Sequence, residues 1–508
     1  MSKNYLCLLI GIFALVLGAT PVLAKDHWIT LKTKNFTVIS NAEEKKTIEL
    51  ALKLEQFRYI FSQIYPDTPA TEPVPVTVYI FKDDGAFKPF KPTYQGKRRN
   101  DIGGYFQSGT DENIIAFNSS VAALQFIFHE YTHLITSYST IELPPWINEG
   151  LAELYSTFEI EKDQAVLGSP IAHHVHNLRN SDLPLLPLQK LINADTKSPL
   201  YNESDKATLF YAQSWAFIHY LMLGDQGAHK PQLFRYIKLL KKGTSPDQAF
   251  VEAFQTNFEK MAQELRLYTA KSLYPIVKYR LDSTLSEKNF NLQPLTEAQT
   301  ELYLGNLLLH SNRVEEAEKR FQRAVALDES LSLAIEKLAT VALRRENFTQ
   351  AKDLFRQALT RGTINYLVHY QLAEALYQEA GKQRTLDNIA IETAQTIIDN
   401  AKAALKLKPE FAPAYHLLAL AQLASGINYA EGIEAAQAAT MMAPRKKEYL
   451  FTLVRLQMQQ HNYIAALKTL EPLLSSDNPD LKNTALALKQ MIEEKIQANK
   501  ETVAPQSK

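Results

Sequence analysis

The stretch FIFHEYTHLITSYSTIELPPWINEGLAEL, residues 126–154, combines two histidines, four glutamates and a Pro-Pro pair. His129 and His133 are separated by about 1.1 turns of an α-helix, so both imidazoles lie on one helix face. Imidazole nitrogen is a preferred zinc ligand, and a catalytic zinc takes three protein ligands and keeps one position for water. Glu130 lies beside that position and can accept a proton from the water. The spacing therefore predicts a helix that supplies two zinc ligands and a general base.

The third zinc ligand is expected from the helix that follows the Pro-Pro turn at 144–145. A helix–turn–helix hairpin would bring Glu149 back over the metal. Glu153, one turn later, competes for this role; Glu149 is preferred, and Glu153 would then accept a hydrogen bond from a ligating imidazole. Glu142, in the loop, is expected to be solvated. Because the residues around the two histidines are strongly apolar, a His-Glu-His group there needs a compensating partner, which favours a metal over a solvated surface helix.

HEYTH followed by PPWINEGLAEL resembles the gluzincin metallopeptidases, whose third ligand is the glutamate of a W-[LI]-N-E-G segment. In particular, the chain looks like the peptidase MA-like family of exported bacterial proteins, which are often fused to tetratricopeptide repeats. The similarity covers roughly residues 28–270. The resemblance implies one zinc ion per chain, held by His129, His133 and Glu149, and a general base at Glu130.

The resemblance also implies a residue that stabilises the transition state. Aminopeptidase-type gluzincins place a tyrosine before a Lys-Gly pair at the start of an apolar helix, and its hydroxyl donates to the oxyanion. LFYAQSWAFIHYL puts Tyr211 at the corresponding place, with Gln213-Ser214 standing where Lys-Gly is found. The alternative for Tyr211 is a core aromatic residue. His219, two turns further on, is expected to be structural.

Three other segments are candidates for the cleft. GTDEN (109–113) is similar to the G-x-M-E-N segment that holds a substrate's free amine in such aminopeptidases, but it lacks the methionine and is also ordinary turn composition. The strand NIIAFN (113–118) is expected to be the edge strand along which a substrate pairs. HHVH (173–176) shows no helical ligand spacing and is expected in an exposed loop lining the cleft.

The first 24 residues have the three regions of a secretory signal. Lys3 precedes an apolar run at 6–18, and Val22-Leu23-Ala24 offers a cleavage site. The run is too short to span a bilayer core of roughly 30 Å. Cys7, the single cysteine, lies in this run, so the mature chain has neither a disulfide nor a thiol nucleophile. The protein is therefore expected to be exported, periplasmic or secreted, without a transmembrane segment in the mature chain.

Composition and charge narrow the function classes. The 508 residues favour two or three domains, and 46% hydrophobic with 22% charged residues is typical of folded protein. Lys plus Arg and Asp plus Glu number 55 each. This balance gives no overall field towards nucleic acid or anionic lipid, so no nucleic-acid partner is expected.

Residues 25–275 are predicted to form an α+β, zincin-like metallopeptidase domain, because strand patterns at 28–39, 74–81 and 113–118 precede a mainly helical stretch. After a linker at 276–297, an all-α solenoid is predicted at 298–480. The residues that recur 34 positions later are Leu304-Gly305, Ala317, Phe321 and Ala324, which return as Leu338-Ala339, Ala351, Phe355 and Ala358. That period is typical of tetratricopeptide repeats, of which about five are expected. Residues 481–508 are expected to form a capping helix and a tail that is disordered after about residue 496.

These patterns predict an exported zinc metallopeptidase that hydrolyses peptide bonds through a metal-activated water. A solenoid of repeats presents a concave groove that takes a peptide or protein partner. The alternative is a catalytically inactive or highly selective peptidase-like module for binding or assembly in the cell envelope. The complete ligand set and Glu130 favour the peptidase, because a fold without catalysis has no need of the base.

Overall fold

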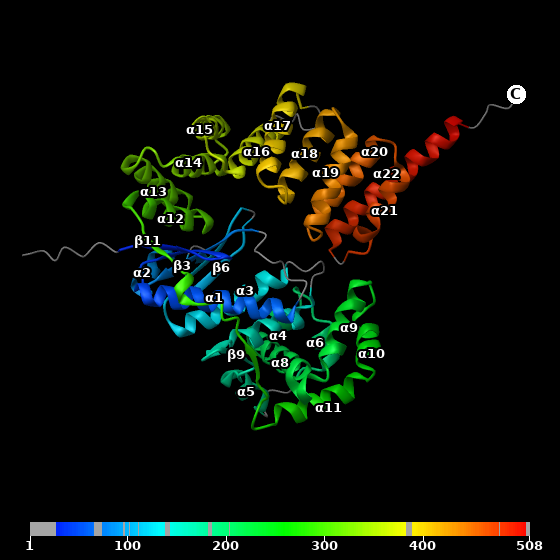
Figure 1. The fold of residues 1–508 in the computed structure, drawn as a ribbon. Helices are drawn as coiled ribbons and strands as arrows, with labels where there is room; N and C mark the ends of the chain where they lie inside the picture. The colour runs from blue at the N-terminus through cyan, green and yellow to red at the C-terminus, as the bar shows by residue number, and fades with distance from the viewer. Residues whose placement is uncertain are drawn as a thin grey trace, which may run out of the picture.

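The computed structural model describes residues 27–65, 74–94, 97–100, 102–109, 111–137, 143–180, 185–202, 204–382, 389–476 and 478–503. The predicted signal segment 1–24, with Cys7, and the loop residue Glu142 lie outside these ranges. Within the described ranges, no helix combines the length and the apolar character needed to cross a membrane. An N-terminal half built on a sheet is followed by an arc of helices (Figure 1).

A six-stranded mixed sheet is the framework of the N-terminal half. Its strand order is β11-β1-β2-β3-β7-β6; β2, β3 and β7 run parallel, and the other neighbours pair antiparallel. The strands are β1 (Ile29–Lys32), β2 (Phe36–Ser40), β3 (Val76–Phe81), β6 (Gly104–Gln107), β7 (Asn113–Asn118) and β11 (Leu292–Pro294). The side chains of a strand alternate between the two faces, and β3 and β7 are buried along their whole length. The sheet is therefore covered on both sides.

One face of the sheet is covered by helices of the same half. They are α1 (Glu44–Ile64), α3 (Val121–Ser137) and α4 (Pro145–Ser156). Val78 and Ile80 of β3 pack into this layer, where Phe57 of α1 stacks on Phe128 of α3 with ring centroids 4.7 Å apart. Burying each such side chain contributes about 1.5–3 kcal/mol. The apolar neighbours of the two histidines thus hold α3 firmly against the core.

The opposite face of the sheet is covered by the C-terminal half. Tyr79 and Phe81 of β3 share one hydrophobic cluster with Leu307 of α12 (Glu297–His310). The Tyr79 hydroxyl donates to the backbone carbonyl of Tyr303 at 2.9 Å. The first helix of the solenoid is therefore part of the core of the N-terminal half.

The expected linker at 276–297 belongs instead to two sheets, so that prediction is wrong. β11 pairs with β1 at the edge of the main sheet. β10 (Val277–Arg280) pairs with β9 (Gln164–Leu167), which pairs with β8 (Glu159–Glu161). The strands have partners more than a hundred residues earlier in the chain, which local composition does not reveal. A two-stranded ribbon, β4 (Thr93–Tyr94) and β5 (Lys97–Arg98), is separate from both sheets.

The rest of the N-terminal half is helical. Its helices are α2 (Asp84–Phe87), α5 (Ala172–Arg179), α6 (Leu188–Ile192), α7 (Pro199–Asn202), α8 (Ser204–Leu223), α9 (Lys230–Lys241), α10 (Pro246–Phe254) and α11 (Phe258–Thr269). α8 packs along α4 at Gly150. An added Cβ there would lie 2.4 Å from Ile218 Cγ1 and 2.5 Å from the carbonyl oxygen of Ser214. The close approach of these two helices therefore requires glycine.

Gly150→Ala is expected to lower the free energy of unfolding by about 1–3 kcal/mol, because α4 and α8 must move apart. Helix propensity alone would make alanine more stable than glycine by up to about 1 kcal/mol. The sign of the change in the free energy of unfolding therefore tests the packing. Chemical denaturation of the chain from residue 25 to residue 508 measures this change. Leu267→Ala, at a residue that is 72% exposed, is the control and should change stability by less than about 0.5 kcal/mol. A stabilised Gly150→Ala variant would contradict the close packing.

Five packed helix pairs form most of the C-terminal half. They are α12 with α13 (Val314–Leu327), α14 (Ser332–Arg344) with α15 (Phe348–Thr360), α16 (Tyr366–Lys382) with α17 (Ile391–Leu407), α18 (Ala412–Ser425) with α19 (Tyr429–Met442), and α20 (Lys447–Gln459) with α21 (Tyr463–Leu474). Small residues recur where the helices meet: Ala317 and Ala324 are fully buried, and an added Cβ at Gly305 would lie 2.7 Å from the Phe321 ring. The C-terminal half is a TPR-like helical solenoid, which confirms the predicted repeats.

The last helix, α22 (Pro479–Val503), continues past residue 496, where the disordered tail was expected to begin. Its Ala485 and Ile492 share a cluster with Leu470 and Leu473 of α21. The helix thus covers the apolar side of the last pair. Residues 504–508 lie outside the described ranges.

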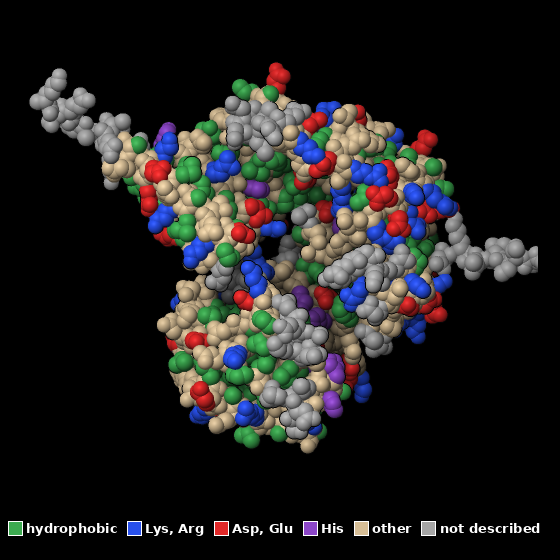
Figure 2. All heavy atoms as spheres, turned by 180° about the vertical axis from the view of Figure 1, so that it is seen from behind, with side chains coloured by type: hydrophobic (Ala, Val, Ile, Leu, Met, Phe, Trp, Pro, Cys, Tyr) green, Lys and Arg blue, Asp and Glu red, His purple; other side chains and the backbone are tan. Residues whose placement is uncertain are grey.

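Among the described residues, hydrogen bonds join the solenoid to the N-terminal half at two widely separated places. At the first pair, the Asn306 amide donates to Glu112 Oε2 at 2.6 Å. Beyond the fourth pair, Arg445 Nη1 donates to the backbone carbonyl of Ser137, the last residue of α3, at 3.0 Å. Between these contacts, the space-filling view shows an opening, with histidine and acidic side chains along its rim (Figure 2). The solenoid therefore forms an arch whose far end returns to the HEYTH helix.

Candidate metal centre

Three side chains from α3 and α4 converge on one point. His129 Nε2 and His133 Nε2 are 3.1 Å apart, and Glu149 Oε2 lies 3.6 Å from the former and 3.4 Å from the latter. Zinc bonds of about 2.0–2.1 Å at tetrahedral angles separate neighbouring donors by about 3.3 Å. The three atoms thus have the spacing and the donor chemistry that suit one zinc ion. Among the described residues, this is the one such group of three.

Local sequence explains the convergence. Ser120 begins α3, and its Oγ accepts a hydrogen bond from the backbone N–H of Ala123 at 3.3 Å. Pro145 occupies the first turn of α4, where its missing N–H costs nothing. Trp146 is then buried against the ring of Phe217, at a centroid distance of 4.9 Å. The turn and the tryptophan together hold α4 over the two histidines.

Burial and charge set the ionisation of the cluster. Burial raises the pKa of Glu149, but hydrogen bonds and charge from His129 and His133 outweigh it and hold the pKa at about 2. Burial lowers the pKa of His133, but the Glu149 carboxylate outweighs it and raises the pKa overall. Burial also raises the pKa of Glu130, against the opposing effect of the two histidines. One carboxylate therefore stays ionised between the imidazoles, while the carboxyl beside them takes up a proton more readily than an exposed glutamate does.

Glu153 links the cluster to a third histidine. Its Oε1 lies 3.6 Å from Nδ1 of His129, the ring nitrogen that faces away from the group of three. Its Oε2 lies 3.2 Å from Nε2 of His174. Burial raises the pKa of Glu153, but His174 and His129 lower it overall. Glu149 is thus the carboxylate that stands with both Nε2 atoms, and Glu153 is placed to orient His129.

The HHVH stretch at 173–176 is helical and not the loop that was expected, while His173 and His176 are exposed as expected. It lies in α5, and His174 is 3% exposed. The His174 ring packs near Trp215 of α8, with centroids 5.9 Å apart. The sequence spacing did not predict the contact of His174 with Glu153, because it joins α4 to a helix that is separate in the sequence.

Tyr211 is half-buried on α8, and its ring meets that of Phe210 edge-on at 6.1 Å. Its role as an oxyanion donor stays a prediction. Gln213, which stands where the resembled family has lysine, exchanges two hydrogen bonds of 2.8 Å with the Leu186 backbone. His219 is fully buried with both ring nitrogens hydrogen-bonded, as expected for a structural histidine.

The strand at 113–118 is not an edge strand, so that expectation is wrong. β7 lies between β3 and β6, and β6 forms the edge beside α3. An added Cβ at Gly104 of β6 would lie 3.2 Å from Ile127 Cδ1 of α3. An extended peptide that pairs with the sheet at this edge would therefore meet β6.

The acidic residues of GTDEN contact the solenoid. Asp111 Oδ1 lies 3.4 Å from Nε2 of His310, and Glu112 accepts hydrogen bonds from Asn306 and Thr77. Burial raises the pKa of Asp111, but the hydrogen bond with His310 outweighs it and holds the pKa well below its usual range. Thr110 lies outside the described residues. These carboxylates join the two halves of the molecule, and this use replaces the suggested recognition of a substrate amine.

Asp111→Asn is expected to lower the free energy of unfolding by about 1–3 kcal/mol, because His310 loses a charged partner. The pKa of Asp111 is depressed in the folded chain, so its contribution is present above the ordinary value of 3.8 and is lost as the pH falls through the folded value. The difference in the free energy of unfolding between Asp111→Asn and wild type should therefore have its largest value at about pH 7 and begin to decrease below about pH 4. Denaturation curves recorded at about pH 7 and below about pH 4 test this pH dependence. The control is Asp353→Asn on α15, whose side chain is 70% exposed. Equal stability of Asp111→Asn and wild type at neutral pH would contradict the prediction.

A cavity of about 100 Å³ opens beside the group of three. The residues that line it are His133, Thr136, Ser137, Leu143, Pro145, Asn148, Glu149, Thr196 and Arg445. Arg445 comes from the solenoid, so the arch completes the wall of the candidate site.

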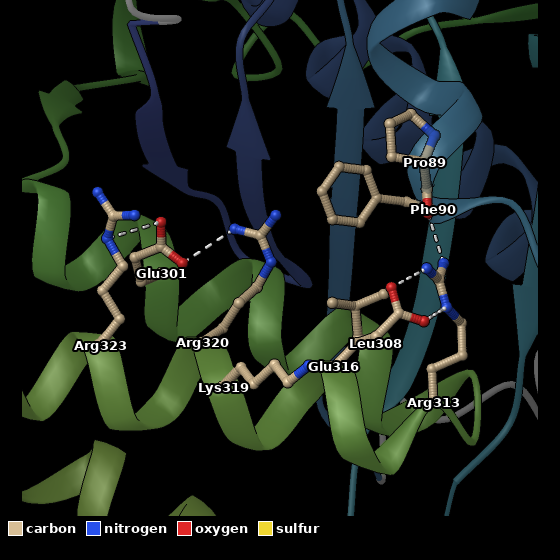
Figure 3. Close-up of a pocket in the computed structure, with 9 residues that line it drawn as sticks. All are labelled: Pro89, Phe90, Glu301, Leu308, Arg313, Glu316, Lys319, Arg320 and Arg323. Atoms are coloured by element: carbon tan, nitrogen blue, oxygen red, sulfur yellow. Dashed lines mark hydrogen bonds and ion pairs between the residues drawn. The ribbon is translucent and has the colours of Figure 1, made fainter.

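A larger cavity of about 480 Å³ lies where α12 and α13 meet Pro89 and Phe90 (Figure 3). Most of its charged residues pair with one another. Arg320 Nη1 lies 2.9 Å from Glu301 Oε2, and Arg313 pairs with Glu316. This cavity therefore marks a polar seam between the two halves.

Neither a protein-family model nor a curated protein matches the chain. Solved structures similar to it include YrrB, described as a TPR protein with an unusual peptide-binding site, at 22% identity and a TM-score of 0.32; the match covers 38% of this chain and 92% of that one. A thermophilic TPR protein of Thermus thermophilus matches at 18% identity and a TM-score of 0.30, over 38% of this chain and 98% of that one. PilF of Pseudomonas aeruginosa matches at 16% identity and a TM-score of 0.31, over 42% of this chain and 93% of that one.

Proposed function

We propose that this chain is a zinc-dependent metallopeptidase that hydrolyses peptide bonds. The observation that carries the proposal is the set of donor separations of 3.1, 3.4 and 3.6 Å between His129, His133 and Glu149. A structural zinc is normally enclosed by four protein ligands, and the described residues provide three. Three ligands leave one position for water, which is the arrangement of a catalytic site.

Each residue then has a chemical role. When bound, zinc supplies the Lewis acidity that activates a water and polarises the peptide carbonyl. The residues that would hold it are His129, His133 and Glu149. Glu130 takes the proton of the attacking water and passes it to the leaving amine. Glu153 orients His129 through Nδ1, which leaves Nε2 on the side of His133 and Glu149. Tyr211 is proposed to donate to the oxyanion.

We also propose that the solenoid binds a peptide or protein segment in its concave groove. A cavity of about 280 Å³ is lined by residues of α14 and α16, among them Arg344, Tyr370 and Glu374, together with Asp111. Its mixture of aromatic and charged side chains suits a polypeptide, since such a segment offers both apolar and charged groups. The signal-like segment 1–24 supports action outside the cytoplasm.

The alternative is a peptidase-like module that binds or assembles partners in the cell envelope without catalysis. The half-buried Glu130 beside the histidines favours the peptidase, because binding alone requires no base at this position. Measurements on one preparation of the protein can distinguish the peptidase from the binding module.

Zinc content and peptide hydrolysis of the purified mature chain (residues 25–508) test the proposal together. We expect one zinc per chain and cleavage of a mixed peptide library. A chelator should abolish cleavage, and added zinc should restore it. Failure to bind or regain zinc would refute the peptidase proposal, and zinc binding without cleavage of any peptide would favour the binding module.

A further inference from the structure

The loop between α19 and α20 brings a cation to the metal cavity. It contains Pro444, Arg445 and Lys446, and Arg445 lines the same cavity as His133 and Glu149. Arg445 Nη1 donates to the carbonyl of Ser137, one turn after His133, at 3.0 Å. A residue of the fourth repeat is therefore fixed beside the proposed reacting centre.

Arg445 brings a guanidinium into the lining of this cavity. Among the described residues of the lining, the other charged group apart from His133 is Glu149, whose carboxylate stands with the two histidines. A bound zinc ion (+2) would offset the carboxylates of Glu130 and Glu149, and Glu153 lies behind His129 against His174. The Arg445 guanidinium is then the cation that the lining offers to a ligand. The cavity therefore offers a charged hydrogen-bond donor to an anionic ligand group.

The guanidinium has the geometry to bind such a group. It presents five N–H donors, and the Ser137 carbonyl engages Nη1. The planar fork matches a carboxylate, which accepts two parallel hydrogen bonds from it. A cavity of about 100 Å³ admits a group no larger than a small side chain or a chain terminus. A carboxylate at the end of a peptide or on a short acidic side chain fits both the charge and the volume.

We infer that Arg445 is a specificity-determining residue that binds a carboxylate of the peptide substrate beside the scissile bond. This inference rests on the proposed peptidase function. The carboxylate has two possible sources, a free C-terminus and an Asp or Glu side chain, and both are recognised by the same charge-assisted hydrogen bonds. Specificity would then depend on the solenoid, since the recognising residue lies more than 300 residues after α3.

Peptide binding to the zinc-loaded, full mature chain carrying Glu130→Gln tests the inference without turnover. The first pair of probes is N-acetylated tetra-alanine as the free acid and as the C-terminal amide. The second pair is the amides of acetyl-Ala-Ala-Glu-Ala and acetyl-Ala-Ala-Gln-Ala. Isothermal titration is carried out with this chain and with the same chain carrying Arg445→Ala, Arg445→Lys or Lys446→Ala.

We expect one carboxylate probe to bind about tenfold or more tightly than its neutral partner, as a charged hydrogen bond implies. The pair that shows the preference identifies the source of the carboxylate. Arg445→Ala should reduce the ratio of the two affinities, carboxylate probe over neutral probe, to about one. Arg445→Lys should keep part of this preference, because lysine retains the positive charge without the planar fork, and Lys446→Ala should leave the ratio unchanged. A purely structural role of Arg445 would weaken both members of a pair equally and leave the ratio unaltered.

Two results would overturn the inference. One is equal affinity for the carboxylate and the neutral probe in both pairs, measured on a chain that holds zinc. Absence of binding by all four probes counts as the same result. The other is an unchanged ratio in Arg445→Ala. Zinc content separates these failures from failure of the proposed function: a wild-type chain that binds no zinc refutes both, whereas a zinc-loaded chain that cleaves peptides without charge preference refutes only the role of Arg445.

Discussion

Glu130→Gln is expected to lower kcat by about 10²- to 10⁴-fold while the chain still holds one zinc. The amide keeps the size of the side chain but cannot accept the proton of the attacking water. Glu130 is half-buried next to both histidines, and burial raises the pKa of its carboxyl, so it is suited to taking up and releasing a proton. KM should change much less than kcat, because the proton moves in the transition state.

Three measurements decide this prediction: zinc content, kcat and KM on one cleaved peptide. Glu159→Gln, at an exposed glutamate of β8, is the matched control and should match wild type in all three. Full activity of Glu130→Gln would exclude Glu130 as the base. Loss of zinc in the same variant would show instead that Glu130 supports the ligands.

Glu149→Ala is expected to remove zinc from the chain and with it all activity. The Glu149 carboxylate is 3% exposed and lies 3.6 and 3.4 Å from the two Nε2 atoms, so its loss leaves two imidazoles and no anionic ligand. The loss of affinity should exceed the roughly 10- to 100-fold that removal of an outer hydrogen-bond partner costs. Circular dichroism is needed beside the zinc titration, to show that the variant is folded.

Glu153→Gln is the comparison that assigns the third ligand. Glu153 Oε1 faces Nδ1 of His129, the opposite side of the ring from the proposed metal, so zinc affinity should fall only by about 10- to 100-fold. The reverse order, in which Glu153→Gln loses zinc and Glu149→Ala keeps it, would make Glu153 the ligand. Either outcome resolves the choice between the two glutamates that the WINEGLAEL segment presents.

The sequence predicts features that depend on local periodicity. His129 and His133 share a helix face because of the helical repeat, and Ala317 and Ala351 recur because neighbouring helix pairs pack through small residues. The interior position of β7 was not predictable in this way. Strand order depends on pairing between distant segments, and β6 is a four-residue strand that begins with glycine.

The sequence did not predict some parts of the candidate site, and the physical reason is the same. His174 joins Glu153 across two helices, and Arg445 meets Ser137 across 308 positions of the chain. Neither contact leaves a spacing pattern, because each arises only when whole elements pack together. The residues that hold the proposed metal were accessible from sequence, whereas those that surround it required the fold.

The cover that α12 provides for the sheet has a consequence for synthesis. A ribosome releases the N-terminal half first, with Tyr79 and Phe81 still uncovered and β1 lacking its neighbour β11. The half that carries HEYTH becomes a finished globule only after residue 310 has emerged. A chain cut before α12 would expose that apolar face and aggregate. The half that carries HEYTH therefore completes its folding late, after translation of α12.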